Sequence, residues 1–503
     1  MAFRRSGLPI LFAAALLLGA SLGGCRAQRE MARSHNVLMS TSDEEKLGED
    51  ASEEVAKTLG FLADEELAGY VRDVGTRLAR NSPRAEIRYR FHVVEMEEPN
   101  AFALPGGHVY VSRGLLALVN SEQELANVLA HEVAHVALQH HAYRELEVRR
   151  TKVVGALAVL VGALAGGPGA AMITAQGFLI AGQGMLAAYT RDQEREADWL
   201  GQELARDAGW DPLAMASFLR SLDRDTRMKR GSTRLAGYFD THPGSIERET
   251  KAAVRYEHAA PLPDDARGRE AYLERIEGLV VGQNPDEGVF AGTRFLHPGL
   301  DFSLRFPDGW RTINEHAAVR AVSPRADAMV LLELQGEGED PEAAAREYAE
   351  KAELKLEGAE TRRIHGNRAF RARTVLELSG SKVKADVTWI AHAGRIFRIM
   401  AVVRAGRLMP TASLDRVARS FRRLTPSERD GMRVTRLRLA RPEPGESLDG
   451  LSLRTANEWS RDRTAVMNGL AIGAEPEPGE PLKIAVAERW LPADARDDGD
   501  ATR

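Results

Sequence analysis

Three residues between positions 126 and 141 have the types and the spacing of a metal-dependent catalytic site. His131, Glu132 and His135 follow one another in the order H-E-x-x-H. On a helix, a spacing of four residues brings both imidazoles onto one face, where they can hold one metal ion. Zinc accepts neutral imidazole nitrogens in a tetrahedral shell, and a position left open to water lowers the pKa of that water to about 7. The pattern therefore predicts a zinc site with Glu132 as the general base.

The surrounding residues predict the helix that this geometry needs. Ser121 and Glu124 have the spacing of a capping box at a helix start. Apolar residues at helical spacing follow, namely Leu125, Val128, Leu129 and Val136. The alternative is a helix that carries HExxH by chance, so a third ligand has to decide.

That ligand is found downstream, in the stretch TRDQEREADWLG. Glu194 and Asp198 are one helical turn apart and face the same way on a helix. Glu194 can complete a shell of two histidines and one carboxylate, and Asp198 can accept the second N–H of a ligand imidazole. The alternative is the acidic, solvated start of a helix, which is how we interpret Glu196. We expect one zinc ion per chain, bound by His131, His135 and Glu194.

Four stretches in this order resemble a known family: NAFALPGGHVYVSRGLL from Asn100, HEVAH from His131, EREAD from Glu194 and THPGSIER from Thr241. From about residue 40 to about residue 255, the sequence resembles the zinc metallopeptidases of the CAAX prenyl protease, HtpX and BepA type. The resemblance implies a mainly helical, zincin-type domain with a small edge sheet. It also implies that His131, His135 and Glu194 bind zinc. Glu132 takes the role of catalytic base, and Asp198 that of partner to a ligand histidine.

The last of these stretches adds His242 and Arg248, which in the resembling family approach the active site. Hydrogen-bond donors there would stabilise the oxyanion of a tetrahedral intermediate. Alternatively, His242 coordinates the zinc in a resting state without substrate. A histidine in the turn before a helix, with no chemical role, is the third interpretation.

A short strand is predicted from His108 to Ser112, after the turn-rich Pro105-Gly106-Gly107. The resemblance places this strand at the edge of the sheet, beside the helix that carries HExxH. An edge strand offers unpaired N–H and C=O groups, so an unfolded peptide can add to it as a further strand. A plain hairpin turn is the alternative interpretation of the glycines.

The N-terminus predicts export and lipidation. Residues 1–24 resemble a lipoprotein signal peptide, in which two arginines precede an apolar stretch too short for a comfortable membrane span. Leu22-Gly23-Gly24-Cys25 resembles a lipobox, and Cys25 is the only cysteine, so the chain cannot form an internal disulfide. A lipid on Cys25 would anchor the protein to a membrane. Arg26 favours the inner leaflet of the outer membrane, on the periplasmic side of a Gram-negative bacterium.

Residues 153–188 are apolar and rich in Ala and Gly. Their first arm, 153–165, is shorter than the about twenty residues needed to span a bilayer. We interpret the segment as two buried helices or as a mobile cover over the cleft. A hairpin that dips into a membrane is the alternative.

Composition and strand patterning set the wider organisation. The 503 residues, 44% of them hydrophobic, are enough for about three globular domains. The net charge of −5 argues neither for nor against a charged partner, and no stretch has the pattern of a nucleic-acid-binding face. Alternating strands after residue 300 and a helix capped by Asp340 predict an antiparallel α+β domain that faintly resembles PsbP-like domains. Stretches at Pro444, Ala465 and Pro478 resemble a LysM module, which binds peptidoglycan.

The predicted order along the chain is signal peptide 1–24, tether 25–41, zinc metallopeptidase domain 42–257, linker with a short helix 258–294, α+β accessory domain 295–425, LysM-like module 430–488 and disordered tail 489–503. The fold class is α+β.

These features predict a lipid-anchored zinc metalloendopeptidase of the bacterial cell envelope. Its location and the resemblance suggest misfolded or unassembled envelope proteins as substrates, with peptidoglycan as a further partner. No helical repeat of about 34 residues follows the peptidase domain, so partner recognition must differ from that of BepA-type proteins. The alternative is a non-proteolytic envelope chaperone or peptidoglycan-binding scaffold with a structural or closed zinc site. A structural site usually has four protein ligands and no need of Glu132.

Overall fold

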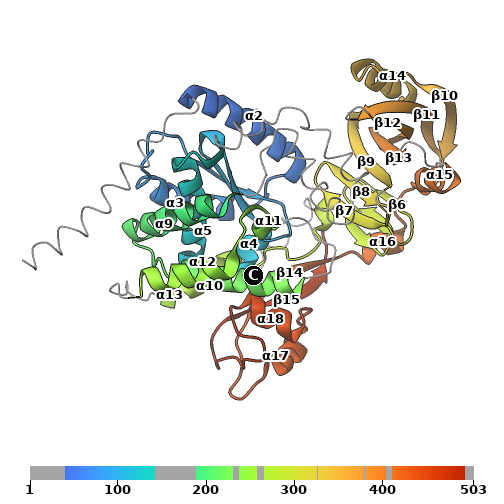
Figure 1. Ribbon diagram of the computed structural model, residues 1–503. Helices are drawn as coiled ribbons and strands as arrows, with labels where there is room; N and C mark the ends of the chain where they lie inside the picture. Colours follow the sequence, from blue (N-terminus) through green and yellow to red (C-terminus); the bar gives the residue numbers. More distant parts are fainter. Residues whose placement is uncertain are drawn as a thin grey trace, which may run out of the picture.

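The computed structural model describes residues 40–141, 189–229, 237–257, 266–325, 327–378, 381–403 and 411–492 (Figure 1). The predictions for the signal peptide, Cys25, almost all of the tether, the apolar segment 153–188 and most of the tail lie outside these residues. Within the described ranges, no helix has both the length and the apolar character that crossing a bilayer requires.

The N-terminal half is mainly helical around one small sheet, as predicted. Its strands are β1 (Arg90–Val94), β2 (Ala101–Leu104) and β3 (His108–Ser112). Its helices are α2 (Thr41–Leu59), α3 (Glu65–Ala79), α4 (Arg113–Leu118), α5 (Glu122–Ala137), α9 (Arg191–Asp207), α10 (Ala214–Met228), α11 (Tyr238–Thr241), α12 (Ser245–Arg255) and α13 (Ala266–Ile276). Apolar faces of α3, α5, α9 and α10 meet in one core.

The helix starts follow local capping rules. The Ser121 hydroxyl accepts from the N–H of Glu124 at the start of α5. The Glu124 carboxylate reaches the N–H of Asn120 instead of that of Ser121, so the predicted capping box is only half formed. In α2 the cap is Ser40, whose side chain accepts from the N–H of Asp43.

The strand order corrects one prediction. The small sheet has the order β1-β3-β2, with β3 parallel to β1 and antiparallel to β2. The strand His108–Ser112 is therefore central, and β2 takes the place at the sheet edge that packs against α5. The sequence of β3 alone gave no information on its partners, because strand order depends on pairing between distant segments.

The second half contains a larger antiparallel sheet with the order β10-β11-β12-β13-β9-β8-β7. Its strands are β7 (Arg311–Glu315), β8 (Ala318–Val322), β9 (Ala328–Glu337), β10 (Glu357–Ile364), β11 (Asn367–Leu378), β12 (Ser381–His392) and β13 (Arg395–Val403). Helix α14 (Pro341–Lys351), capped by Asp340 as predicted, contributes Ala345 to the core on one face. The other face is covered by α15 (Thr411–Arg419) and by β4 (Val289–Ala291), β5 (Arg294–His297) and β6 (Phe302–Arg305). The α+β fold class is confirmed.

The C-terminal segment contains a strand, two short helices and a strand, in this order, after the five-residue α16 (Pro426–Asp430). Strand β14 (Arg433–Ala440) pairs antiparallel with β15 (Leu482–Arg489), and α17 (Leu448–Thr455) and α18 (Arg461–Met467) lie between them in sequence. Figure 1 shows the large sheet with α14 as a lobe beside the peptidase helices, and α18 below α10, which it contacts.

Candidate metal centre

Helices α5 and α9 carry the predicted site and pack directly on each other. His131, Glu132 and His135 lie on α5, and all three are fully buried. Glu194 and Asp198 lie one turn apart on the face of α9 that meets α5. The structure thus brings together residues that are 63 positions apart, because two amphipathic helices bury their apolar faces against each other.

Four side chains converge on one point: His131, His135, Glu194 and His242 offer ligand atoms that all lie within 4.8 Å of one another. The Nε2 atoms of His131 and His135 are 2.9 Å apart. His242 Nδ1 lies 3.4 Å from His131 Nε2 and 2.9 Å from Glu194 Oε1. Glu194 Oε1 is also 3.4 Å from His135 Nε2.

These separations fit a tetrahedral metal ion. Ligands at about 2.1 Å on the corners of a tetrahedron lie about 3.4 Å apart, and the distances above, 2.9 and 3.4 Å, are equal to that value or somewhat shorter. The donor set of three imidazoles and one carboxylate is also one that zinc prefers. His131 Nδ1 lies 3.1 Å from Asp198 Oδ1, and an ionised carboxylate can only accept. The proton of His131 is therefore on Nδ1, and the lone pair of Nε2 faces the centre.

The electrostatics keep the His135 imidazole neutral and the Glu194 carboxylate charged. Burial holds the pKa of His135 well below 6.5, so its ring is neutral at pH 7. Burial alone would raise the pKa of Glu194, but the neighbouring His242 and Arg248 hold it well below its usual range. Neutral imidazole and ionised carboxylate are the forms in which these residues bind a metal ion.

Arg248, on α12, binds the acidic residues behind the cluster. Its Nε and Nη2 donate to the two oxygens of Asp198 at 2.8 and 2.7 Å, and Nη1 lies 2.5 Å from Glu194 Oε2. Nη1 also donates to the carbonyl of His242. Burial would raise the pKa of Asp198, but Arg248 lowers it to about 2. The described contacts therefore direct all three guanidinium nitrogens at the protein itself.

His242 ends α11 and lies between the cluster and Glu132. Its ring stacks on Tyr238, with centroids 4.2 Å apart. Its Nδ1 faces Glu194, and its Nε2 lies 3.6 Å from Glu132 Oε1. In this arrangement His242 offers a fourth ligand atom beside those of His131, His135 and Glu194.

Sequence reasoning missed three residues around His135. The ring of Tyr189 stacks on His135 with centroids 3.7 Å apart. His140 Nδ1 lies 2.9 Å from His135 Nδ1, and His140 Nε2 lies 3.2 Å from Glu196 Oε2. Glu196, which we interpreted as part of a solvated helix start, thus faces the site through His140. The histidine at position 140 follows HExxH closely in sequence and was the only available signal.

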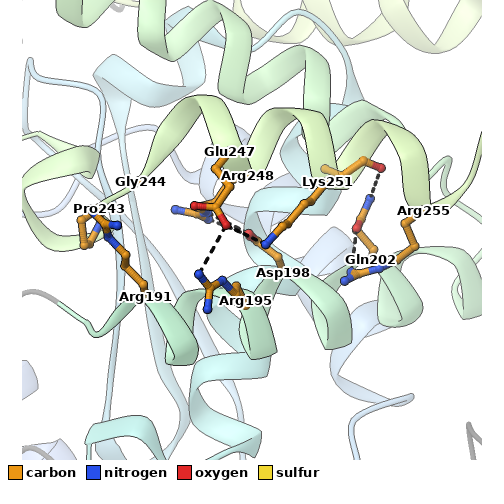
Figure 2. Close-up of a pocket in the computed structure, with 11 residues that line it drawn as sticks. Arg191, Arg195, Asp198, Gln202, Pro243, Gly244, Glu247, Arg248, Lys251 and Arg255 are labelled. Carbon is orange, nitrogen blue, oxygen red and sulfur yellow. Dashed lines mark hydrogen bonds and ion pairs between the residues drawn. The ribbon is translucent and has the colours of Figure 1, made fainter.

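A cavity of about 200 Å³ opens between α9 and α12, behind the cluster. Figure 2 shows Asp198 and Arg248 on its wall, and Glu247 between Arg195 and Lys251. Among the described residues, its lining includes none of the four that converge. The cavity therefore borders the residues that support the site and not the site itself.

Comparison with known proteins agrees with this geometry. The family model of peptidase family M48 matches residues 65–255. The beta-barrel assembly-enhancing protease of Yersinia pestis is 29% identical over 237 residues, which are 46% of this chain and 48% of that protein. The mitochondrial metalloendopeptidase OMA1 of Schizosaccharomyces pombe is 30% identical over 215 residues, which are 41% of this chain and 59% of that protein.

The chain spans about half the length of the first of these curated relatives. A solved structure, LpqN involved in cell envelope biogenesis of Mycobacterium tuberculosis, covers 26% of this chain and 84% of its own at 15% identity. Its TM-score of 0.19 is too low to carry an argument. The range 65–255, which is similar to peptidase family M48, contains every residue of the converging cluster.

Proposed function

We propose that this protein is a zinc-dependent endopeptidase of the bacterial cell envelope. The observation that carries the proposal is the buried convergence of His131, His135 and Glu194 beside Glu132. Zinc bound by these three ligands would polarise the scissile carbonyl and lower the pKa of a water molecule. The other roles fall to side chains of the chain itself.

Glu132 is the proton carrier in this proposal. Its carboxylate accepts a proton from the attacking water and later delivers it to the nitrogen of the leaving amine. Asp198 keeps the His131 proton on Nδ1, so that Nε2 remains a ligand. Arg248 acts as a positioning residue rather than an oxyanion donor, because its nitrogens already serve Asp198, Glu194 and the His242 carbonyl.

The extended substrate would pair with β2. The outer side of this strand has no further strand beside it in the described part of the chain, and α5 packs against it. Main-chain pairing holds a peptide extended and reads backbone more than side chains. This mode suits unfolded segments of many sequences.

The substrates, location and partners are inferred from names and resemblance. Relatives are named beta-barrel assembly-enhancing proteases, and on this basis we propose misfolded or unassembled envelope proteins as substrates. A lipid on Cys25 would hold the enzyme at the periplasmic face of the outer membrane. The segment 430–488 would act as a LysM-like module for peptidoglycan, and the domain 295–425 would position partners.

The second candidate function has a zinc site that is closed to water and substrate, and the position of His242 favours it. With His242 the cluster has four protein donors, the number typical of structural zinc sites. In an enzyme this arrangement would be a resting state from which His242 must withdraw to admit water and substrate. In a non-proteolytic chaperone or scaffold, it would persist.

Cleavage of casein by the full-length protein in detergent micelles, with zinc measured on the same sample, tests the proposal. We expect about one zinc per chain and cleavage by the parent, and we expect Glu132→Gln to keep the zinc and lose cleavage by at least about 100-fold. Zinc without cleavage in the parent, with cleavage gained in His242→Ala, would indicate a closed resting site. A parent protein that binds no zinc would refute the metal assignment.

A further inference from the structure

His140 lies outside the converging cluster and yet touches one of its members. Helix α5 ends at Ala137, and Gln139 adopts a left-handed backbone conformation with φ of 54°. Non-glycine residues adopt this conformation uncommonly. The turn directs the His140 ring back onto the underside of His135, where it is almost fully buried.

The contacts of His140 fix where its proton lies. Its Nε2 is 3.2 Å from a carboxylate oxygen of Glu196, which in the ionised form only accepts hydrogen bonds. A lone pair on Nε2 would face that negative charge, so the proton is on Nε2. The lone pair of a neutral His140 ring is then on Nδ1.

The same reasoning extends to His135. Its Nδ1 lies 2.9 Å from His140 Nδ1, and two lone pairs at that distance repel unless a cation lies between them, as the metal ion would between the Nε2 atoms of His131 and His135. His135 Nδ1 therefore carries a proton and donates it to His140. This leaves a lone pair on His135 Nε2, the atom that faces His131 and Glu194.

We propose that His140 and Glu196 are positioning residues that hold His135 in the tautomer and orientation needed to bind the metal ion. This inference rests on the proposed metal site. It gives His135 the support that Asp198 gives His131, with one difference. Asp198 contacts His131 directly, whereas the Glu196 carboxylate acts on His135 through an imidazole.

The two residues contribute unequally. His140 is buried against His135, so its removal leaves a buried N–H without its acceptor. The Glu196 side chain is 55% exposed, so water can replace part of its effect. Loss of a partner that supports a metal ligand typically weakens metal binding about 10- to 100-fold. We expect that range for His140→Leu, and a smaller weakening of about 3- to 10-fold for Glu196→Gln.

The test is the zinc affinity of the full-length protein, measured by competition with a chromophoric chelator. Asp192→Asn is the matched control for Glu196→Gln, because it also removes one negative charge from the N-terminal part of α9. Asp192 is exposed and contacts Arg195, away from the cluster. We expect the affinity of this variant to stay within about twofold of the parent value.

A second measurement separates positioning from general stability. Nitrogen chemical shifts of ¹⁵N-histidine-labelled apoprotein report which ring nitrogen of His135 carries the proton. We expect Nδ1–H in the parent and a mixture of tautomers in His140→Leu. If His140→Leu does not fold, Glu196→Gln and its control decide the question by the same two measurements.

The outcomes distinguish this inference from the proposed function. Unchanged zinc affinity and an unchanged His135 tautomer in the folded variants would overturn the role of His140 and Glu196 alone. A parent protein without zinc affinity would overturn the metal site and this inference with it. Weakened affinity together with tautomer mixing would support both.

Discussion

At the scale of single residues, Arg248 is the cation that makes the buried acidic pair tolerable. Asp198 and Glu194 are both buried, and burial of uncompensated carboxylates costs several kcal/mol. Arg248 contacts both, and it is itself only 4% exposed. Because Asp198 has its pKa lowered to about 2, it stabilises the fold above the unfolded pKa of about 3.9. That contribution is lost as the pH falls through about 2.

Arg248→Gln should therefore destabilise the protein strongly at pH 7. Breaking a buried ion pair from one side costs about 3–5 kcal/mol, since the carboxylates stay buried without their partner. Urea denaturation measures the change. Arg195→Gln is the control: its ion pairs with Asp192 and Glu247 are exposed, and we expect a loss below about 1 kcal/mol. Equal losses in the two variants would contradict the role of Arg248.

Residue spacing predicted the convergence on α5 and α9 but not the partners behind it. His131 and His135 share a face, as do Glu194 and Asp198, because the helix repeat alone determines this. The contact between His140 and His135 instead requires the left-handed turn at Gln139. No periodic pattern in the sequence predicts such a turn or the contact of Glu196 with His140 that it allows. Glu196 was therefore interpreted as an ordinary surface residue.

At the scale of elements, a close approach of α5 and α9 sets the geometry of the site. A Cβ added to Gly201 would lie 2.9 Å from the Cα and N atoms of His131, which belong to the backbone of α5. Gly201 follows Asp198 by one turn on the buried face of α9. Glycine at this point lets the two helix backbones touch, which brings Glu194 and Asp198 within reach of the histidines.

Gly201→Ala should push the two helices apart. Overpacking of this kind costs about 1–3 kcal/mol, and we expect zinc affinity to fall because the carboxylates move away from the imidazoles. Gly69→Ala on α3 is the matched control: only the flexible end of Arg72 lies nearby, at 3.5 Å. Alanine at such an open helical site stabilises by up to about 1 kcal/mol. Thermal melting should show a lower melting temperature for Gly201→Ala and a higher one for Gly69→Ala. Chelator competition should show weaker zinc binding in Gly201→Ala alone.

Most helices and strands could be predicted from the sequence, whereas the elements that pair or pack beside them could not. Alternating apolar residues marked β11, β12 and β13, and Asp340 with Pro341 marked the start of α14. The central position of β3 could not be predicted from the sequence of that strand, since it depends on pairing with two separate segments, β1 and β2.

At the scale of the whole molecule, the C-terminal segment is joined to the peptidase half. Leu437, Met467 and Ala485 belong to the same hydrophobic core as α5 and α9. The backbone of β14 bonds to residues 278–281, after α13. The segment 430–488 was predicted to be a separate LysM-like module. Burial that it shares with distant segments leaves no local pattern in the sequence, so this contact could not be predicted.

Lys483 links the two parts directly. It is fully buried on β15, and its ammonium donates to the carbonyls of Ala117, Leu118 and Val119 at 2.8, 3.2 and 2.8 Å. These carbonyls end α4, and α5 begins three residues after Val119. A cation there satisfies the unpaired carbonyls of a helix C-terminus and interacts favourably with its dipole.

Lys483→Met should destabilise the peptidase half together with the C-terminal segment. Methionine keeps the apolar stem but leaves the carbonyls of Ala117 and Val119 without the Lys483 donor, while Leu118 keeps a hydrogen bond from the Asn120 side-chain amide. We expect a loss of about 1–3 kcal/mol, reduced by the desolvation cost that the ammonium no longer incurs. Lys57→Met is the matched control, since Lys57 also places a cation at a helix C-terminus, in the last turn of α2, but is 67% exposed. We expect a change within about 0.5 kcal/mol.

Denaturation of the full-length chain, followed by far-UV circular dichroism and by the zinc affinity of the folded protein, measures the effect of Lys483→Met. Because Lys483 fixes the connection from which α5 starts, we expect both the unfolding midpoint and the zinc affinity to fall. Two separate transitions, with only the smaller one shifted, would instead mean that the C-terminal segment folds independently. In that case the buried ammonium would stabilise its own module without supporting the helix that carries His131 and His135.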